Sequence, residues 1–232
     1  MYEIYMNINH LIGMLIIIAF CLLGYTHFEN FTNEVGYTKS SLDDKEYLVR
    51  NLKDKQQAAD LLAKVRAKLI KIVDHVKVAT DDQVKKYAST EEKGVITETK
   101  ESFDLLVSRF QPDNISESTP NNKYTSYSVN KGQKIVFCLR AKSKDEKLVE
   151  ENVIMFVAIH ELAHIMTKSV GHTEEFWNSF RILLRVAIEL KLYKNHDYGT
   201  APVDYCGTKI TDTPLKESLR NVTKETNSPI EK

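Results

Sequence analysis

The feature that most constrains this chain is an apolar segment that ends in two histidines and a glutamate. Residues 147–169 predict a helix, and from Val153 to Ile159 every residue is apolar, so the helix should run through the centre of a folded domain. His160, Glu161 and His164 follow directly. Residues four apart share one helix face, so both imidazoles can be directed at one point. Buried polar groups of this kind need a ligand or a partner.

This spacing is typical of zinc hydrolases. Two neutral imidazoles bind the ion, a third protein ligand completes the set, and a nearby carboxylate takes a proton from the attacking water. We therefore predict that His160 and His164 bind zinc and that Glu161 is the catalytic base, as in a metalloprotease. Two alternatives stay open: the histidines are structural, or the site binds zinc without catalysis.

The third zinc ligand has several candidates, namely His172, Glu174, Glu175, His196 and Asp197. His172 is preferred because it follows Gly171, where a turn can bring the chain back to the metal. A glutamate of the following helix, Glu175 or Glu189, is the main alternative. Glu174 and Glu175 also have a simpler explanation, since they fall in the first turn of a helix capped by Thr173. Phe176, Trp177 and Phe180 are expected to pack in the core beneath the site.

The remaining patterns predict an α+β domain in which a small β-hairpin packs on helices. Apolar positions at three- and four-residue steps predict a long helix over 43–78 and a second over 98–110. Segments 124–129 and 134–140 flank a glycine-containing turn and predict the hairpin. We expect four parts: an anchor (1–28), a tether (29–41), a catalytic domain (42–213) and a disordered polar tail (214–232).

Composition favours one domain without a nucleic-acid surface. The chain has 232 residues, 42% of them hydrophobic, enough for one core. Lys plus Arg and Asp plus Glu both number 32, so no net charge indicates binding to nucleic acid. The three cysteines lack a Cys-x-x-Cys spacing, which excludes a zinc ribbon. Cys138 and Cys206 could pair, but no pattern supports that bond.

The N-terminal segment predicts a membrane anchor. No formal charge occurs from Ile4 to Phe28, and the centre is almost wholly apolar, so it could span a bilayer. A cleaved signal peptide is the alternative, but a basic region and a small-residue cleavage site are missing. We therefore expect a single-pass membrane protein. Lys39 and Lys45 follow the segment, which favours a body on the cytoplasmic or interior side.

Residues 58–192 resemble the WLM family and its SprT-like relatives, which are zincin-type metalloproteases linked to cleaving proteins crosslinked to DNA. The segment 128–140 is similar to the family's Asn-x-Gly-x-Lys-Ile hairpin. His160-Glu161-Leu162-Ala163-His164 with 171–177 is similar to its zinc signature. The resemblance implies a zincin-like fold, Zn²⁺ bound by His160, His164 and His172, and Glu161 as base. It also implies that an edge strand containing Ile135, Val136, Phe137 and Cys138 pairs with an extended protein or peptide substrate.

Two departures from the family shape the functional prediction. The run from Ile165 to Gly171 is about two residues longer than usual, and no DNA-binding tail is present. The anchor and the segment 204–207 are similar to WLM-like membrane proteins of large DNA viruses, which implies a virion membrane as a location. We thus predict a membrane-anchored zinc metalloendopeptidase. The alternatives are a non-catalytic scaffold protein that keeps the fold and a DNA-dependent protease for protein–DNA crosslinks.

Overall fold

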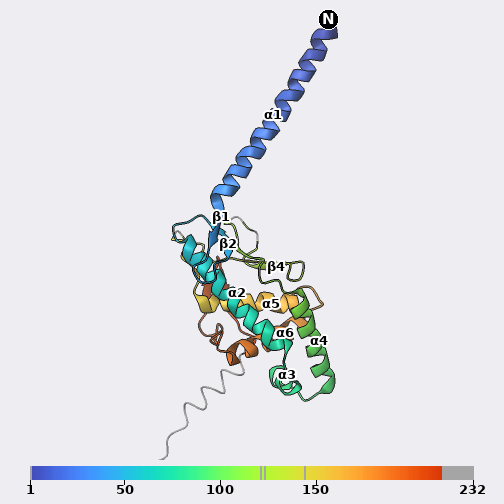
Figure 1. Cartoon of the computed structure of the whole chain (residues 1–232), viewed down its shortest axis with the longest axis vertical. Helices are drawn as coiled ribbons and strands as arrows, with labels where there is room; N and C mark the ends of the chain where they lie inside the picture. Colours follow the sequence, from blue (N-terminus) through green and yellow to red (C-terminus); the bar gives the residue numbers. More distant parts are fainter. Residues whose placement is uncertain (1, 121, 123, 144, 216–232) are drawn as a thin grey trace, which may run out of the picture.

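The computed structural model describes residues 2–120, 122, 124–143 and 145–215. Its body packs around one central helix, α5 (Glu151–Met166), in which twelve of sixteen residues are buried. Helices α2 (Lys55–Lys77), α4 (Lys93–Arg109) and α6 (Glu174–Glu189) contact α5 from different sides (Figure 1). The predicted central helix is therefore confirmed, with shorter bounds. A helix that is apolar on every face has to be enclosed in this way.

The segment before α2 forms a β-hairpin instead of helix. Strands β1 (Val35–Lys39) and β2 (Glu46–Arg50) pair antiparallel. The prediction of one helix over 43–78 is thus wrong up to residue 54, and β1 occupies part of the predicted tether. The cause is a period-2 pattern, because Tyr47 and Val49 are buried, whereas Glu46 is exposed and Leu48 and Arg50 are partly exposed.

A three-stranded sheet covers one side of α5, and its strand order changes one prediction. Strand β5 (Lys134–Phe137) pairs antiparallel with β4 (Tyr127–Val129), which confirms the predicted hairpin. It also pairs in parallel with β3 (Ile115–Glu117), from a segment that we expected to be a surface loop.

The strand predicted as the substrate-pairing edge is therefore the centre of the sheet. Both of its sides are already paired, and Ile135, Val136 and Phe137 are buried. Cys138, just after the strand, is bonded to Cys206. The edge prediction for these four residues is wrong because β3 was not foreseen, and β4 is the edge that faces α5.

The remaining helices follow the local signals. Thr80 begins α3 (Asp81–Ala88) with a capping box, and Thr173 caps α6 as predicted by accepting a hydrogen bond from the backbone N–H of Phe176. After α6, strands β6 (Val203–Tyr205) and β7 (Thr208–Ile210) form a further hairpin. The Cys138–Cys206 disulfide ties this hairpin to the end of β5.

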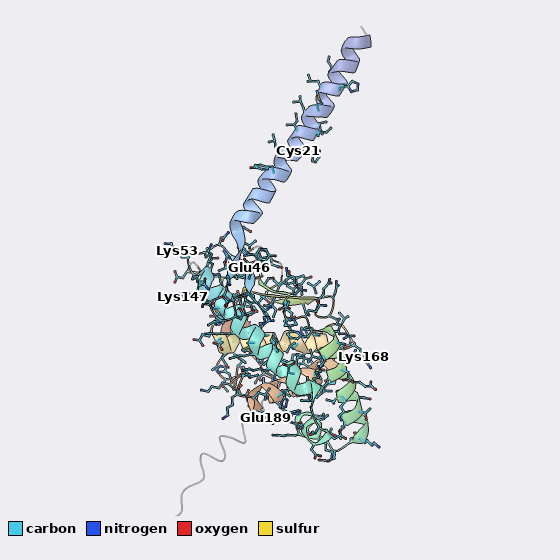
Figure 2. All side chains as sticks on the ribbon, viewed as in Figure 1. Cys21, Glu46, Lys53, Lys147, Lys168 and Glu189 are labelled. Carbon is cyan, nitrogen blue, oxygen red and sulfur yellow. A yellow bond between two sulfur atoms is a disulfide. The ribbon has the colours of Figure 1, made fainter. Side chains whose placement is uncertain are left out.

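Helix α1 (Tyr2–Glu34) projects away from the body (Figure 1). Cys21 lies on this helix, away from the body, and is free (Figure 2). The prediction of a single-pass membrane protein is contradicted: among the described residues, no helix combines the length and the apolar character needed to cross a bilayer. Asn9 and His10 limit the continuous apolar run to Leu11–Tyr25, which spans about 22 Å against a hydrocarbon core of about 30 Å. We had used the expected anchor to predict a membrane partner, a membrane orientation and a virion-membrane location. Without an anchor, these three predictions are no longer supported.

The predicted polar tail lies mainly outside the described residues, which end at Leu215. Leu215 itself is buried against the core.

Candidate metal centre

Three histidines converge at one end of the central helix. His160 and His164 are one helical turn apart on α5, and their Nε2 atoms lie 3.2 Å from each other. His172 comes from the loop between α5 and α6, and its Nε2 atom lies 3.2 Å from that of His160. The ligand atoms of all three residues lie within 4.8 Å of one another. The structure thus brings together the three histidines that the sequence singled out.

This donor set fits a zinc ion. Imidazole nitrogens bind zinc at about 2.0–2.1 Å in a tetrahedral arrangement, which places two such nitrogens about 3.3 Å apart. The observed 3.2 Å separations agree with that value. Burial, followed by the neighbouring histidines, lowers the pKa of His160 to about 3. Burial and His172 lower the pKa of His164 to about 4. Both rings are therefore neutral at physiological pH, the form that binds a metal.

Phe176 holds the three rings in place from below. Its side chain is fully buried in the first turn of α6. It stacks on His164, with centroids 4.3 Å apart and planes at 28°, and it meets His160 and His172 edge-on at 4.8 and 4.7 Å. One aromatic side chain therefore contacts all three imidazoles, which limits the rotation of each ring.

Two cations fix the end of α5, where the chain leaves the helix toward His172. The Lys131 ammonium, on the β4–β5 turn, donates to the carbonyl oxygens of His164 at 3.1 Å, Thr167 at 3.0 Å and Ser169. The Arg109 guanidinium donates to those of Ile165 at 3.0 Å and Thr167 at 2.8 Å. The carbonyls of His164 and Ile165 belong to the last turn of α5 and carry the negative end of the helix dipole, so positive charge is favourable here.

Glu175 holds the same loop from the other side. Its carboxylate oxygens accept hydrogen bonds from the backbone N–H groups of Lys168 at 2.7 Å and Ser169 at 3.0 Å. The hydroxyls of Ser169 and Thr173 are also hydrogen-bonded, at 2.7 Å. The loop carrying His172 is therefore anchored at several points, which accommodates the longer run noted in the sequence.

The other candidates for the third ligand lie outside the cluster and have other partners. Glu174 pairs with Arg181 at 2.9 Å, and Glu189 pairs with Lys86 at 2.7 Å. His196 Nε2 lies 2.9 Å from the carbonyl oxygen of Ala201, and Asp197 accepts from the backbone N–H of Gly199 at 3.0 Å. Of the candidates, His172 is the one that reaches the α5 histidines.

Glu161 lies beside the histidines and is buried, with 4% of its surface exposed. Burial raises the pKa of its carboxyl to about 7, while hydrogen bonds from the hydroxyl and backbone N–H of Ser128 act in the opposite direction. Ser128 belongs to β4, so the edge strand contacts the glutamate directly. A carboxyl with a near-neutral pKa can both accept and donate a proton at physiological pH.

A cleft of about 660 Å³ opens between β4 and the histidines. Its lining includes His160, Glu161, His164 and His172 together with the segment 124–128. Its size is in the range of sites that bind ligands.

Sequence reasoning missed Ser128, Lys131 and Glu175 as supports of the site. Only Lys131 left a signal, because it stands in the Asn-x-Gly hairpin motif. The glycine of that motif, Gly132, has φ +108°, and a Cβ there would lie 2.7 Å from the Arg109 carbonyl oxygen. The motif thus lets the turn approach the ends of α4 and α5.

The chain matches a known family over more than half its length. The model of the WLM domain matches residues 105–228, a range that contains the three histidines, Glu161 and the hairpin. The chain belongs to the WLM family. WLM domains are zincin-like, zinc-dependent metalloproteases, so this chain is a member of a peptidase family.

Relatives of this chain occur in large DNA viruses, which agrees with the viral resemblance noted in the sequence. Protein R325 of Acanthamoeba polyphaga mimivirus is 32% identical over 206 residues, covering 89% of this chain and 98% of that protein. Protein 136R of Invertebrate iridescent virus 6 is 34% identical over 97 residues, covering 41% and 54%. Among solved structures, Wss1 from Saccharomyces cerevisiae matches with a TM-score of 0.32 and 21% identity, over 44% of this chain and 83% of that one.

Proposed function

We propose that this WLM protein is a zinc-dependent endopeptidase of the His-Glu-x-x-His type. His160, His164 and His172 would hold the ion, and Glu161 would be the catalytic base. Bound zinc would supply a Lewis acid that polarises the scissile carbonyl and makes water more acidic. The observation that carries the proposal is the cluster of three histidines, in which the Nε2 atoms of His164 and His172 each lie 3.2 Å from that of His160 and the ligand atoms of all three lie within 4.8 Å of one another. The buried Glu161 carboxyl lies beside this cluster.

Glu161 would move one proton through the reaction. Its carboxylate takes a proton from the attacking water as the water oxygen bonds to the peptide carbon. When the carbon–nitrogen bond breaks, Glu161 returns that proton to the leaving amine. The buried setting that raises the pKa of Glu161 to about 7 suits both transfers.

The substrate would bind as an extended segment along β4. This strand pairs with β5 on one side, and its residues line the cleft beside the histidines. A peptide could add to it by backbone hydrogen bonds, which require an extended backbone and little sequence identity. The substrate-pairing strand is then Tyr127–Val129, in place of the strand we predicted.

The open cleft favours an enzyme over the alternative of a non-catalytic scaffold protein. A scaffold that only keeps the fold would tolerate a covered metal site, yet His172 is exposed and the cleft is open among the described residues. For the DNA-dependent alternative, the balanced charge gives no support.

The test is Glu161→Gln in the full chain. We expect one zinc per chain in both proteins, and cleavage of an unfolded protein such as casein by the parent only. Cleavage by the zinc-loaded variant at the parent rate would contradict the assigned role of Glu161. A zinc-loaded parent that cleaves no unfolded protein would favour the scaffold.

A further inference from the structure

A second cavity, of about 290 Å³, adjoins the metal centre. The His160 ring lines both this cavity and the larger cleft, so the two spaces meet at one zinc-binding side chain. The other walls come from Phe156 of α5, Trp177 and Phe180 of α6, and residues 212–214. We call this space the aromatic pocket.

Two of its walls are rigid. Phe156 and Phe180 are both buried, with ring centroids 5.1 Å apart, and Phe180 meets His160 edge-on at 5.3 Å. Rings fixed on two packed helices cannot easily collapse into the space between them. Phe156 and Phe180 therefore form two fixed walls of the pocket.

Trp177 behaves differently from its neighbours on α6. We expected Phe176, Trp177 and Phe180 all to be core residues, and both phenylalanines are, but 37% of Trp177 is exposed. Its ring centroid lies 5.8 Å from that of His172 and 5.1 Å from that of Phe176. A large aromatic side chain held beside a metal centre with an open face is typical of a binding surface.

The rim gives no preference for an acidic ligand. Arg181 lines the pocket, but its guanidinium is hydrogen-bonded to Glu174 at 2.9 Å and to Asn178. Asp212, also on the lining, carries the opposite charge. The ring walls therefore determine which side chain fits.

We propose that the aromatic pocket is a specificity site that receives a large apolar side chain, such as that of leucine, methionine or phenylalanine, from the substrate residue next to the scissile bond. This inference rests on the proposed function. A peptide lying along β4 with its carbonyl at the histidines places an adjacent side chain at His160, and the pocket volume admits one such group. Apolar sites discriminate large from small side chains by about tenfold or more.

The experiment uses Trp177 as its reporter, because it is the single tryptophan of the chain. The zinc-loaded, full-length Glu161→Gln variant is titrated with glycine, leucine and phenylalanine hydroxamates, which chelate zinc and differ in side chain. We expect at least about tenfold tighter binding of the two large hydroxamates. These two should also shift the Trp177 emission to shorter wavelength, and the glycine compound should not.

Two further variants test the pocket itself by calorimetry. Trp177→Ala should bring the three affinities close together, while Trp177→Phe should retain the preference. Tyr37→Ala is the matched control, since it removes an exposed aromatic residue on β1, outside the lining of both cavities, and should leave the preference intact.

Equal affinities with unchanged emission would overturn the specificity site while leaving the proposed function standing. An unchanged preference in Trp177→Ala would overturn it as well. Failure of all three hydroxamates to bind the zinc-loaded variant would also overturn the specificity site. Failure of the full-length Glu161→Gln variant to take up zinc would overturn the zinc centre, and with it this inference.

Discussion

The Nε2 atoms of His160 and His172 lie 3.2 Å apart although the two residues are twelve positions apart in the chain. His160 and His164 are brought together by the helix alone, whereas His172 depends on the loop that returns from the end of α5. The third ligand of the centre therefore depends on how that loop is held.

Removing the third ligand should weaken zinc binding strongly. We expect His172→Ala to lower zinc affinity by more than the about 10- to 100-fold typical of losing an outer partner of a ligand. Competition with a chromogenic chelator measures this. His196→Ala is the control, because His196 lies outside the cluster, and it should bind zinc like the parent. Equal losses in both variants would contradict the ligand assignment.

Lys131 should act on zinc through the position of His172. Its ammonium holds the carbonyls of Thr167 and Ser169, so Lys131→Met should free the loop and lower zinc affinity by about 10- to 100-fold. Lys134→Met, an exposed lysine at the start of β5, should have no effect. In a His172→Ala background the Lys131→Met effect should disappear; an effect that persists there would mean that Lys131 acts on the fold as a whole.

Alanine substitutions at Gly132 and Gly171 distinguish a loss of stability caused by a steric clash from one caused by the backbone conformation. Both have positive φ, but a Cβ at Gly132 would lie 2.7 Å from a backbone oxygen, while one at Gly171 meets nothing within 4 Å. Gly171→Ala should cost about 1 kcal/mol of unfolding free energy for the left-handed backbone, and Gly132→Ala clearly more. Urea denaturation without zinc measures both. Similar losses would show that the turn can move away from α4.

Replacing the buried Arg140, which pairs with two carboxylates, should make the cost in unfolding free energy depend on pH. Arg140, 4% exposed, pairs with Glu117 at 2.8 Å and Asp54 at 2.7 Å. Arg140→Met leaves the buried Glu117 without its cation and should cost about 3–5 kcal/mol at pH 7.

The direction of the pH effect follows from the pKa values of two carboxyl groups, that of Glu117, which is raised, and that of Asp54, which is lowered. Burial already raises the pKa of Glu117, and losing Arg140 raises it further, so its penalty shrinks as the pH falls toward the unfolded value of about 4.3. The hydrogen bond from Arg140 lowers the pKa of Asp54, and the stability from that shift disappears as the pH falls through the folded pKa, in the parent only. The Glu117 effect narrows the difference in unfolding free energy between parent and variant from pH 7 to pH 5 in urea denaturation. The Asp54 effect narrows it further only below about pH 4, because the folded pKa of Asp54 lies below its ordinary value. A gap that widens would contradict this account, and adding Glu117→Gln should recover part of the loss at pH 7.

The local patterns of the sequence determined the parts of the site that one element can supply. An apolar run has to be enclosed, and a four-residue spacing directs two imidazoles to one side, so the central helix with His160, Glu161 and His164 was predictable from the residues. Thr173 as a cap and the 124–140 hairpin followed from equally local signals. Gly171 indicated a turn that would return His172, but not how it is held.

Contacts between distant segments were decided by the tertiary structure alone. The parallel pairing of β3 with β5 made the expected edge strand the centre of the sheet, and no periodicity within 134–138 could reveal a partner twenty residues earlier. The Cys138–Cys206 bond, the Lys131 and Glu175 contacts to the His172 loop, and the exposure of Trp177 likewise depend on which surfaces meet. Helix and turn propensities act over a few residues, whereas strand order and pocket walls are fixed by packing across the whole core, and that is why only the folded chain could supply them.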